Sequence, residues 1–287
     1  MLRRRFADLG WGQVHYRTGG HGGAAPLVLL HGAAGNGQGL TRLAEALSET
    51  RLVLVPDLPG CGESDPLPDD APDLGTFAQA LIGFCDAMGL AACDVLGAHL
   101  GARVAMEMAL AAPSRTRRII LDGVGFYDDA GRQEMLERVA PEIRPDPDGI
   151  YLHMAHAMCR DYFRFFPWFA RDPAHRRAAP APDPIAVHAK LLEVLKNGTT
   201  YHRAYRAAIR YRVEDRLPLV RVPALIVATR GDNVAPQAAR AAALLPGAAL
   251  VETPGAADLA ETAAILTRFL DTPASLPQGF PNPGAET

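Results

Sequence analysis

The sequence predicts an α/β protein with a mostly parallel, doubly wound sheet, helices on both faces and an inserted helical segment. Short apolar runs alternate with helical patterns along most of the 287 residues. Strands that are apolar throughout are typical of a parallel sheet covered on both faces. Residues 126–214 instead show helical periodicity without a strand-like run. The hydrophobic share of 48%, against 21% charged residues, allows a sizeable core.

The first half of the chain predicts its elements in a regular order. Residues 6–16 fit a β-hairpin. The apolar run 26–30 ends in a Gly-rich loop before a helix over 40–47. A strand at 52–55 ends in a loop of turn-forming residues, and a helix follows over 74–88.

The second half continues the alternation and sets the expected domain boundaries. A strand at 93–96 turns tightly into an Ala-rich helix, and further strands are expected at 118–123, 224–229 and 249–252, with helices at 237–245 and 261–270. We therefore expect a core of residues 1–124 and 214–271 and a helical cap of residues 125–213. The Pro/Gly-rich tail, residues 272–287, is expected to be disordered or to lie along the surface.

Composition and charge argue against several classes of protein. The formal net charge of −3 offers no basic face for a nucleic acid. No stretch approaches the roughly 18 apolar residues of a membrane span, and the basic start lacks the apolar run of a signal peptide. Four scattered cysteines, Cys61, Cys85, Cys93 and Cys159, indicate a reduced, cytoplasmic protein. The sequence is compatible with a homodimer.

The most informative turn is Gly97-Ala98-His99-Leu100-Gly101, between a strand and the Ala-rich helix. This is the pattern of a nucleophile elbow, in which the glycines let the helix approach the strand and the central residue is held at positive φ. Histidine tolerates that backbone region better than most residues. The sequence thus places His99 where serine, cysteine or aspartate is expected.

Four motifs taken together resemble the α/β-hydrolase superfamily. They are His31-Gly32 after a strand, the loop of residues 57–64, the turn around His99, and residues 230–236. The resemblance covers residues 1–124 and 214–271. It implies the α/β-hydrolase fold with a cap over the cleft, as in the epoxide hydrolase, dehalogenase and carbon–carbon hydrolase branches. It does not name the reaction, because this fold hosts many chemistries.

The triad of this family carries over with two departures. His99 stands at the nucleophile position, Asp232 at the acid position, and Asp258 where the histidine base belongs. Asp122 is the alternative acid position of some capped relatives. We expect His99 and Asp258, together with Asp232, to form a His–carboxylate pair across the cleft, which would raise the basicity of the imidazole and fix its tautomer.

Two chemical roles are open for His99. As a general base it would activate a water or take a proton from a substrate hydroxyl or acidic C–H group. As a nucleophile it would form an acyl-imidazole. We favour the base. If the exchanged residues reflect drift in an inactive relative, His99 is only a polar residue of the cleft.

The resemblance also implies an oxyanion hole made by the backbone N–H groups of Leu100 and Ala33. His31 lies beside the expected cleft and is a substrate-binding candidate, although in this family it is more often a structural hydrogen-bonder. Asp57 and Ser64 are expected to fix their loop.

The expected cap carries further substrate-binding candidates. His153, His156 and Arg160 share one helix face by their spacing, and that face could hang over the cleft or be solvated. Apolar lining is expected from Phe163, Phe166 and Trp168. No third ligand has a suitable spacing from the two histidines, so no metal site is predicted.

The sequence therefore predicts a cofactor-free enzyme that acts on a small, partly apolar organic substrate, formally a hydrolase on the strength of the resemblance. A lyase, hydratase or isomerase is the first alternative, because loss of the serine removes the ordinary acyl-enzyme route. A non-catalytic ligand-binding protein is the second.

Overall fold

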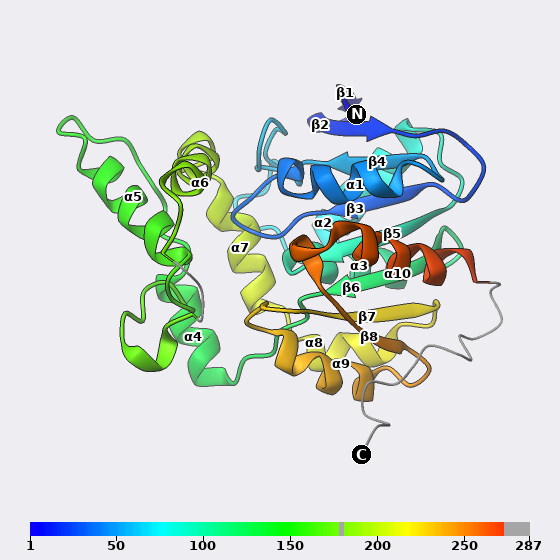
Figure 1. Ribbon diagram of the computed structural model, residues 1–287. Helices are drawn as coiled ribbons and strands as arrows, with labels where there is room; N and C mark the ends of the chain where they lie inside the picture. The colour runs from blue at the N-terminus through cyan, green and yellow to red at the C-terminus, as the bar shows by residue number, and fades with distance from the viewer. Residues whose placement is uncertain (178–180, 273–287) are drawn as a thin grey trace, which may run out of the picture.

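The computed structural model, which describes residues 1–177 and 181–272, contains one eight-stranded sheet (Figure 1). Its strands are β1 (Arg3–Leu9), β2 (Gly12–Gly19), β3 (Leu27–Leu30), β4 (Val53–Pro56), β5 (Cys93–Ala98), β6 (Thr116–Asp122), β7 (Ala224–Thr229) and β8 (Ala249–Thr253). They are ordered β1-β2-β4-β3-β5-β6-β7-β8. The first two form the expected hairpin, β2 is antiparallel to β4, and the remaining pairs are parallel. The predicted mostly parallel sheet is confirmed.

The helices connect these strands and cover both faces of the sheet. They are α1 (Thr41–Leu47), α2 (Leu74–Ala87), α3 (Leu100–Ala111), α4 (Asp129–Arg138), α5 (Ile150–Tyr162), α6 (Pro184–Lys196), α7 (Tyr201–Arg210), α8 (Val213–Arg216), α9 (Ala238–Leu244) and α10 (Leu259–Asp271). None of the helices in the described ranges is both long and apolar enough to cross a membrane.

Alternate side chains of the central strands pack on opposite faces of the sheet. In β3, Leu27 and Leu29 belong to a core cluster with α1 and α10, whereas Val28 and Leu30 belong to the cluster with α2, α3 and α9. All four leucine and valine side chains are fully buried. Burial of each contributes about 1.5–3 kcal/mol relative to exposure, which explains why an uninterrupted apolar run forms a central strand.

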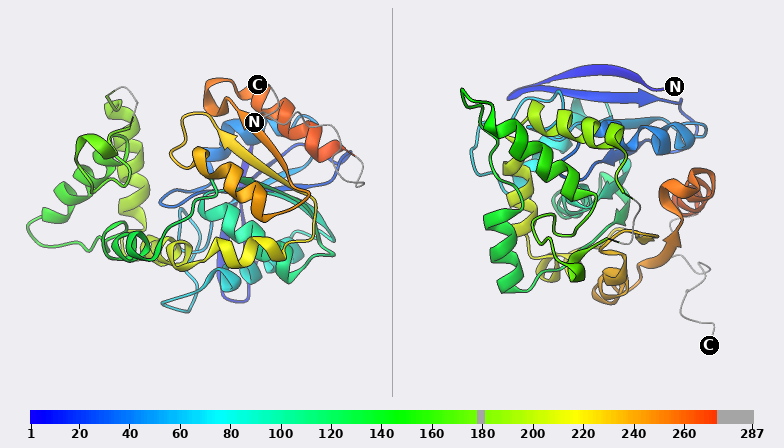
Figure 2. Two further views of the ribbon diagram at one scale, coloured as in Figure 1. Left: turned by 90° about the horizontal axis from the view of Figure 1, so that it is seen from below. Right: turned by 60° about the vertical axis from the view of Figure 1, so that its left-hand side comes forward.

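The helices α4 to α7, here called the helical insertion, follow β6 and stand beyond one end of the sheet (Figures 1 and 2). They share an apolar cluster of their own, which includes Met135, Ala155, Met158, Val187, Val194 and Ile209. The insertion is tied to the sheet because α7 also packs against α3. Residues 273–287, which contain almost all of the predicted tail, lie outside the described residues.

A buried carboxylate fixes the loops beside the site. Asp57 accepts hydrogen bonds from the N–H groups of Gly37 (2.7 Å) and Glu63 (3.0 Å) and pairs with His15 Nδ1 at 2.8 Å. The hydroxyl of Ser64 donates to the Asp57 carbonyl at 2.8 Å. Asp57 and Ser64 therefore hold their loop, as expected, and Asp57 also anchors the Gly-rich loop that follows β3.

Candidate active site

The turn between β5 and α3 has the predicted elbow geometry. His99 has φ 51° and ψ −103°, and it is the one non-glycine residue with positive φ in the described parts of the chain. A Cβ on Gly97 would lie 2.2 Å from the Gly101 carbonyl oxygen, and a Cβ on Gly101 would lie 2.1 Å from the Leu30 carbonyl oxygen. Both glycines are therefore required by close backbone approach, and the turn directs the His99 side chain away from the sheet.

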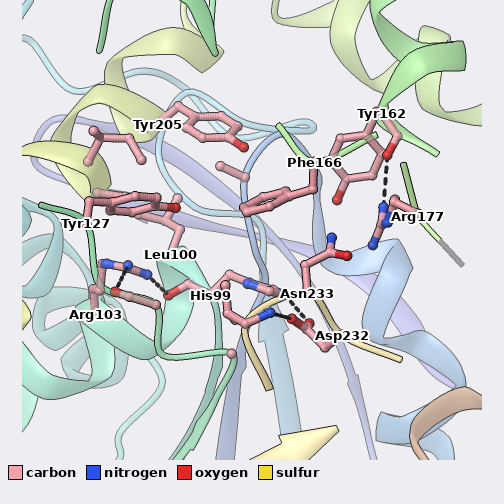
Figure 3. Close-up of a pocket in the computed structure, with 16 residues that line it drawn as sticks. His99, Leu100, Arg103, Tyr127, Tyr162, Phe166, Arg177, Tyr205, Asp232 and Asn233 are labelled. Atoms are coloured by element: carbon pink, nitrogen blue, oxygen red, sulfur yellow. Dashed lines mark hydrogen bonds and ion pairs between the residues drawn. The ribbon is translucent and has the colours of Figure 1, made fainter. Parts of the chain in front are cut away.

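His99 pairs with Asp232, which follows β7. Its Nε2 lies 2.8 Å from Asp232 Oδ2, and the two side chains are 47% and 17% exposed (Figure 3). The second carboxylate oxygen, Oδ1, accepts a hydrogen bond from the Val234 N–H at 2.8 Å. Each oxygen of Asp232 thus has a partner, and the carboxylate is held in one orientation toward the imidazole.

The charge of Asp232 is favoured by these contacts. Burial raises the pKa of Asp232, but the hydrogen bond and the charge of His99, with the Val234 N–H and Arg177, outweigh it, so the pKa is lowered overall. An ionised Asp232 is an acceptor only. Nε2 of His99 therefore carries the hydrogen in this pair, which leaves Nδ1 as the basic nitrogen.

A second carboxylate lies behind the imidazole. Asp122, at the end of β6, accepts hydrogen bonds from the Thr229 hydroxyl at 2.9 and 3.0 Å. Burial raises the pKa of Asp122 to about 6, against the opposing effects of Thr229 and His99. Asp122 acts on His99 through its charge, whereas the direct contact belongs to Asp232. The acid that pairs with His99 is therefore Asp232, and not the alternative acid Asp122.

The expected pairing of His99 with Asp258 is wrong. Asp258 is exposed and begins α10, where its side chain accepts a hydrogen bond from the Glu261 N–H at 2.9 Å. A short carboxylate just before a helix satisfies the unpaired N–H groups of the first turn. After β8 a 3-10 turn, Gly255–Ala257, carries the chain past Thr229 before Asp258 is reached. The carboxylate therefore serves its own helix and not the site.

The predicted oxyanion donors lie beside His99. Leu100 is the first residue of α3, and both Leu100 and Ala33 line the pocket that contains His99. A helix begins with N–H groups that have no partner within the helix, and its dipole favours negative charge at that end. This applies to Leu100, whereas Ala33 lies in the loop that follows β3.

A small pocket of about 80 Å³ surrounds His99 and Asp232 (Figure 3). Its floor comes from the loops after β5, β6 and β7, and its opposite wall comes from the helical insertion. The polar and aromatic side chains that line it, besides His99 and Asp232, are Arg103, Tyr127, Tyr162, Phe166, Arg177, Tyr205 and Asn233. Of these, only Phe166 was expected from the sequence.

The other substrate-binding candidates of the insertion lie elsewhere. His153 and His156 are exposed on α5, and Arg160 pairs with the neighbouring Asp161 at 2.8 Å. Their helix turns Ala155, Met158 and Cys159 inward instead, because these small or apolar side chains fill the cluster of the insertion. Phe163 and Trp168 pack against that cluster as well, and Trp168 Nε1 donates to the Val139 carbonyl at 2.8 Å. None of these five residues lines the pocket around His99.

His31 is a structural residue and not a binding residue. It is buried, its Nε2 accepts a hydrogen bond from the Leu58 N–H at 2.9 Å, and its Nδ1 contacts the Gly32 carbonyl at 2.9 Å. Burial lowers the pKa of His31, so the ring is neutral, with one donor and one acceptor that match these two partners. It fixes the loop that carries Ala33.

The missed residues carried only a weak signal in the sequence. Arg103 lies four residues after His99 on α3, and that spacing places both on one helix face. Tyr205 lies on α7, within residues 126–214, whose periodicity predicts helices but not which of their faces point to the cleft. The fourth residue after an elbow apex is thus worth testing as a pocket residue when only a sequence is available.

No group of three or more His, Cys, Asp or Glu side chains in the described part of the chain is arranged to hold a metal ion. The four cysteines are reduced and buried.

Comparison with known proteins adds relatives over part of the chain. Over 118 residues the chain is 35% identical to a 2-hydroxy-6-oxononadienedioate/2-hydroxy-6-oxononatrienedioate hydrolase of Pseudomonas putida, which covers 39% of this chain and 41% of the relative. It is 41% identical over 131 residues to a pimeloyl-[acyl-carrier protein] methyl ester esterase of Shewanella, which covers 46% of each. The match spans less than half the length of these curated relatives.

Solved structures share the fold over nearly the whole chain. The enol-lactonase from Burkholderia xenovorans aligns with a TM-score of 0.70 at 18% identity and covers 93% of this chain and 99% of that one. Epoxide hydrolase A from Mycobacterium thermoresistibile aligns with a TM-score of 0.69 at 20% identity, over 94% and 98%. A family model for the alpha/beta hydrolase fold matches residues 25–260. This chain belongs to the α/β-hydrolase fold family.

Proposed function

We propose that this chain is a hydrolase of small, partly apolar carbonyl compounds, with His99 as a general base. The observation that carries the proposal is the 2.8 Å pair between His99 Nε2 and Asp232 Oδ2 at the apex of the elbow. A carboxylate that fixes one ring nitrogen leaves the other available to accept a proton. Nδ1 lies beside Gly123, where the absence of a side chain leaves room for the imidazole.

The proposed reaction begins with a water held by His99 Nδ1. The water oxygen forms a bond to the substrate carbonyl carbon while one of its protons passes to Nδ1. The carbonyl oxygen becomes an oxyanion, which the N–H groups of Leu100 and Ala33 would stabilise. Collapse of this intermediate breaks the bond to the leaving group, which takes the proton from the imidazolium.

The helical insertion supports the assignment of a small substrate. It provides Tyr162, Phe166 and Tyr205 as one wall of the pocket, opposite His99. We propose that the insertion acts as a cap. The volume of about 80 Å³ leaves room for a few heavy atoms beside the imidazole, and the three aromatic side chains of this wall favour an apolar substituent.

The relatives favour hydrolysis over elimination or isomerisation. The names of the partial relatives and of the enol-lactonase describe a hydrolase, a methyl ester esterase and a lactonase. All three activities are hydrolytic. The elbow histidine is this chain's own departure, so the same class of reaction would proceed here by direct attack of water.

The proposal is tested by hydrolysis of p-nitrophenyl acetate and butanoate. We expect the wild type to exceed the blank and His99→Ala to lose about 10²- to 10⁴-fold in kcat/KM. Asp258→Asn is the matched control, because it keeps the helix cap and lies outside the pocket; its rate should stay within about twofold. Equal rates for wild type and His99→Ala would contradict the proposal.

The nucleophile alternative is separated by rapid quenching and intact-mass measurement. Direct attack by water predicts no acyl adduct during turnover, since no covalent intermediate forms. An adduct that is present in the wild type and absent in His99→Ala would assign His99 as nucleophile instead.

A further inference from the structure

One cation at the pocket, Arg103, forms no ion pair with any residue of the described ranges 1–177 and 181–272. Arg103 is only 5% exposed, and it donates from Nη1 to the His99 carbonyl at 3.1 Å and from Nη2 to the Gly125 carbonyl at 2.7 Å (Figure 3). Its Nε has no hydrogen-bond partner in the described structure. Burial lowers the pKa of Arg103, yet an arginine side chain remains charged in proteins. A full positive charge is thus held next to His99.

The other buried arginines show how this protein usually neutralises such a charge. Arg51 pairs with Asp271 at 2.7 Å, and Arg132 lies 3.4 Å from Glu214. Arg118 is attracted by Asp94 and Asp271. The ionisable neighbours of Arg103 are instead three phenols, those of Tyr127, Tyr211 and Tyr205, and a further cation, Arg132. An unpaired buried charge is costly. A bound anion would supply the counter-charge that Arg103 lacks.

The remaining pocket is rich in donors and poor in acceptors. Arg177 adds a second cation, and the hydroxyls of Tyr127, Tyr162 and Tyr205 add neutral donors. Burial raises the pKa of Tyr205 well above its usual value, so its hydroxyl keeps its proton. Among the described lining residues the one acidic side chain is Asp232, and it is already paired with His99.

We propose that the pocket binds a small organic carboxylate, with Arg103 as the counter-charge and the hydroxyls of Tyr127 and Tyr205 as donors. The substrate would then be an acid that also carries the hydrolysable carbonyl group. The reaction part of this inference rests on the proposed function, whereas the binding part does not. Because Nε of Arg103 is itself buried, the guanidinium acts through its electric field, which is stronger in the protein interior than in water.

The test compares a carboxylate with its uncharged amide, butanoate with butanamide, by isothermal titration calorimetry. We expect the wild type to bind the acid at least about tenfold more tightly. Arg103→Met should reduce this ratio severalfold, with Arg177 left as the second cation, whereas Arg103→Lys, which keeps the charge, should retain most of it. Arg118→Met removes another buried arginine outside the pocket and should leave the ratio unchanged.

A purely structural role of Arg103 predicts a different result. If the guanidinium only holds the two carbonyls, Arg103→Met weakens acid and amide alike, and the ratio stays the same. That result would overturn the inference, as would a wild type that shows no preference or binds neither probe. If inorganic phosphate binds as tightly as butanoate, the pocket selects anions in general and not carboxylates. Retained preference in a protein without hydrolytic activity would contradict only the proposed function.

Discussion

At the scale of single residues, the histidine at the elbow is accommodated by its neighbours. Gly123, with φ 73°, packs against the imidazole, and a Cβ there would lie 2.7 Å from His99 Nδ1 and Cε1. The sequence predicted His99 and Asp232 because each lies in a motif that comes directly after a strand. It placed Asp258 in the site wrongly, since a motif fixes the position of a loop residue but not the direction of a short side chain.

The contact with Gly123 gives a prediction with a matched control. Gly123→Ala should displace the imidazole and lower kcat/KM about tenfold or more, because a misplaced base loses its alignment. Gly231→Ala has similar backbone strain, with φ 82°, but a Cβ there meets nothing within 4 Å. Both variants should lose about 1–2 kcal/mol in the free energy of unfolding, measured by denaturant titration. An equal loss of activity in the two variants would show that backbone strain, and not the contact, is responsible.

The raised pKa of Asp122 predicts a change of stability with pH. The unfolded value of 3.8 rises to about 6 in the folded protein, so the folded state binds this proton more tightly. The free energy of unfolding should therefore fall as the pH rises from about 4 to about 6, by up to about 3 kcal/mol, and by less where solvent reaches this partly buried carboxylate.

Asp122→Asn tests the source of that fall. Asparagine has no carboxyl proton to lose, so the variant should show a smaller decrease in the free energy of unfolding between pH 4 and pH 7 in denaturant titrations. A decrease as large as that of the wild type would assign it to other groups.

At the scale of secondary-structure elements, helix faces were harder to predict than helix positions. The sequence placed a helix over 74–88 and another over 261–270, close to α2 and α10. For α5 it left open whether the face with His153 and His156 lies over the cleft or in solvent. The structure turns the face with Ala155 and Met158 inward instead, because burial of apolar surface outweighs the placement of polar groups when the two compete.

The cap of α10 gives a prediction at this scale. Asp258→Ala should lower the free energy of unfolding by about 1 kcal/mol, whereas Asp258→Asn should change it by only a few tenths, since asparagine is an equally good cap. Thermal and denaturant unfolding of the two variants measure the difference. Neither substitution should change kcat/KM beyond about twofold, and a large loss of activity in both with intact stability would return Asp258 to the site.

At the scale of the whole molecule, the sheet was predictable and the pocket was not. Apolar runs specify strands such as β3 and β7 locally, and parallel strands then bring the loops after β5, β6 and β7 to one edge. The pocket wall depends on how α5 and α7 pack over that edge, which is a tertiary property with little local signature. Tyr162 and Tyr205 could therefore be assigned to helices from the sequence, but not to the site.

Whether His99 and Asp232 act as one base can be measured by a double-mutant cycle on kcat/KM for p-nitrophenyl butanoate. We expect His99→Ala and Asp232→Asn each to lower kcat/KM. The double variant should be slower than His99→Ala by no more than about twofold, because Asp232 acts through His99. Full activity in Asp232→Asn, or losses that multiply in the double variant, would contradict it.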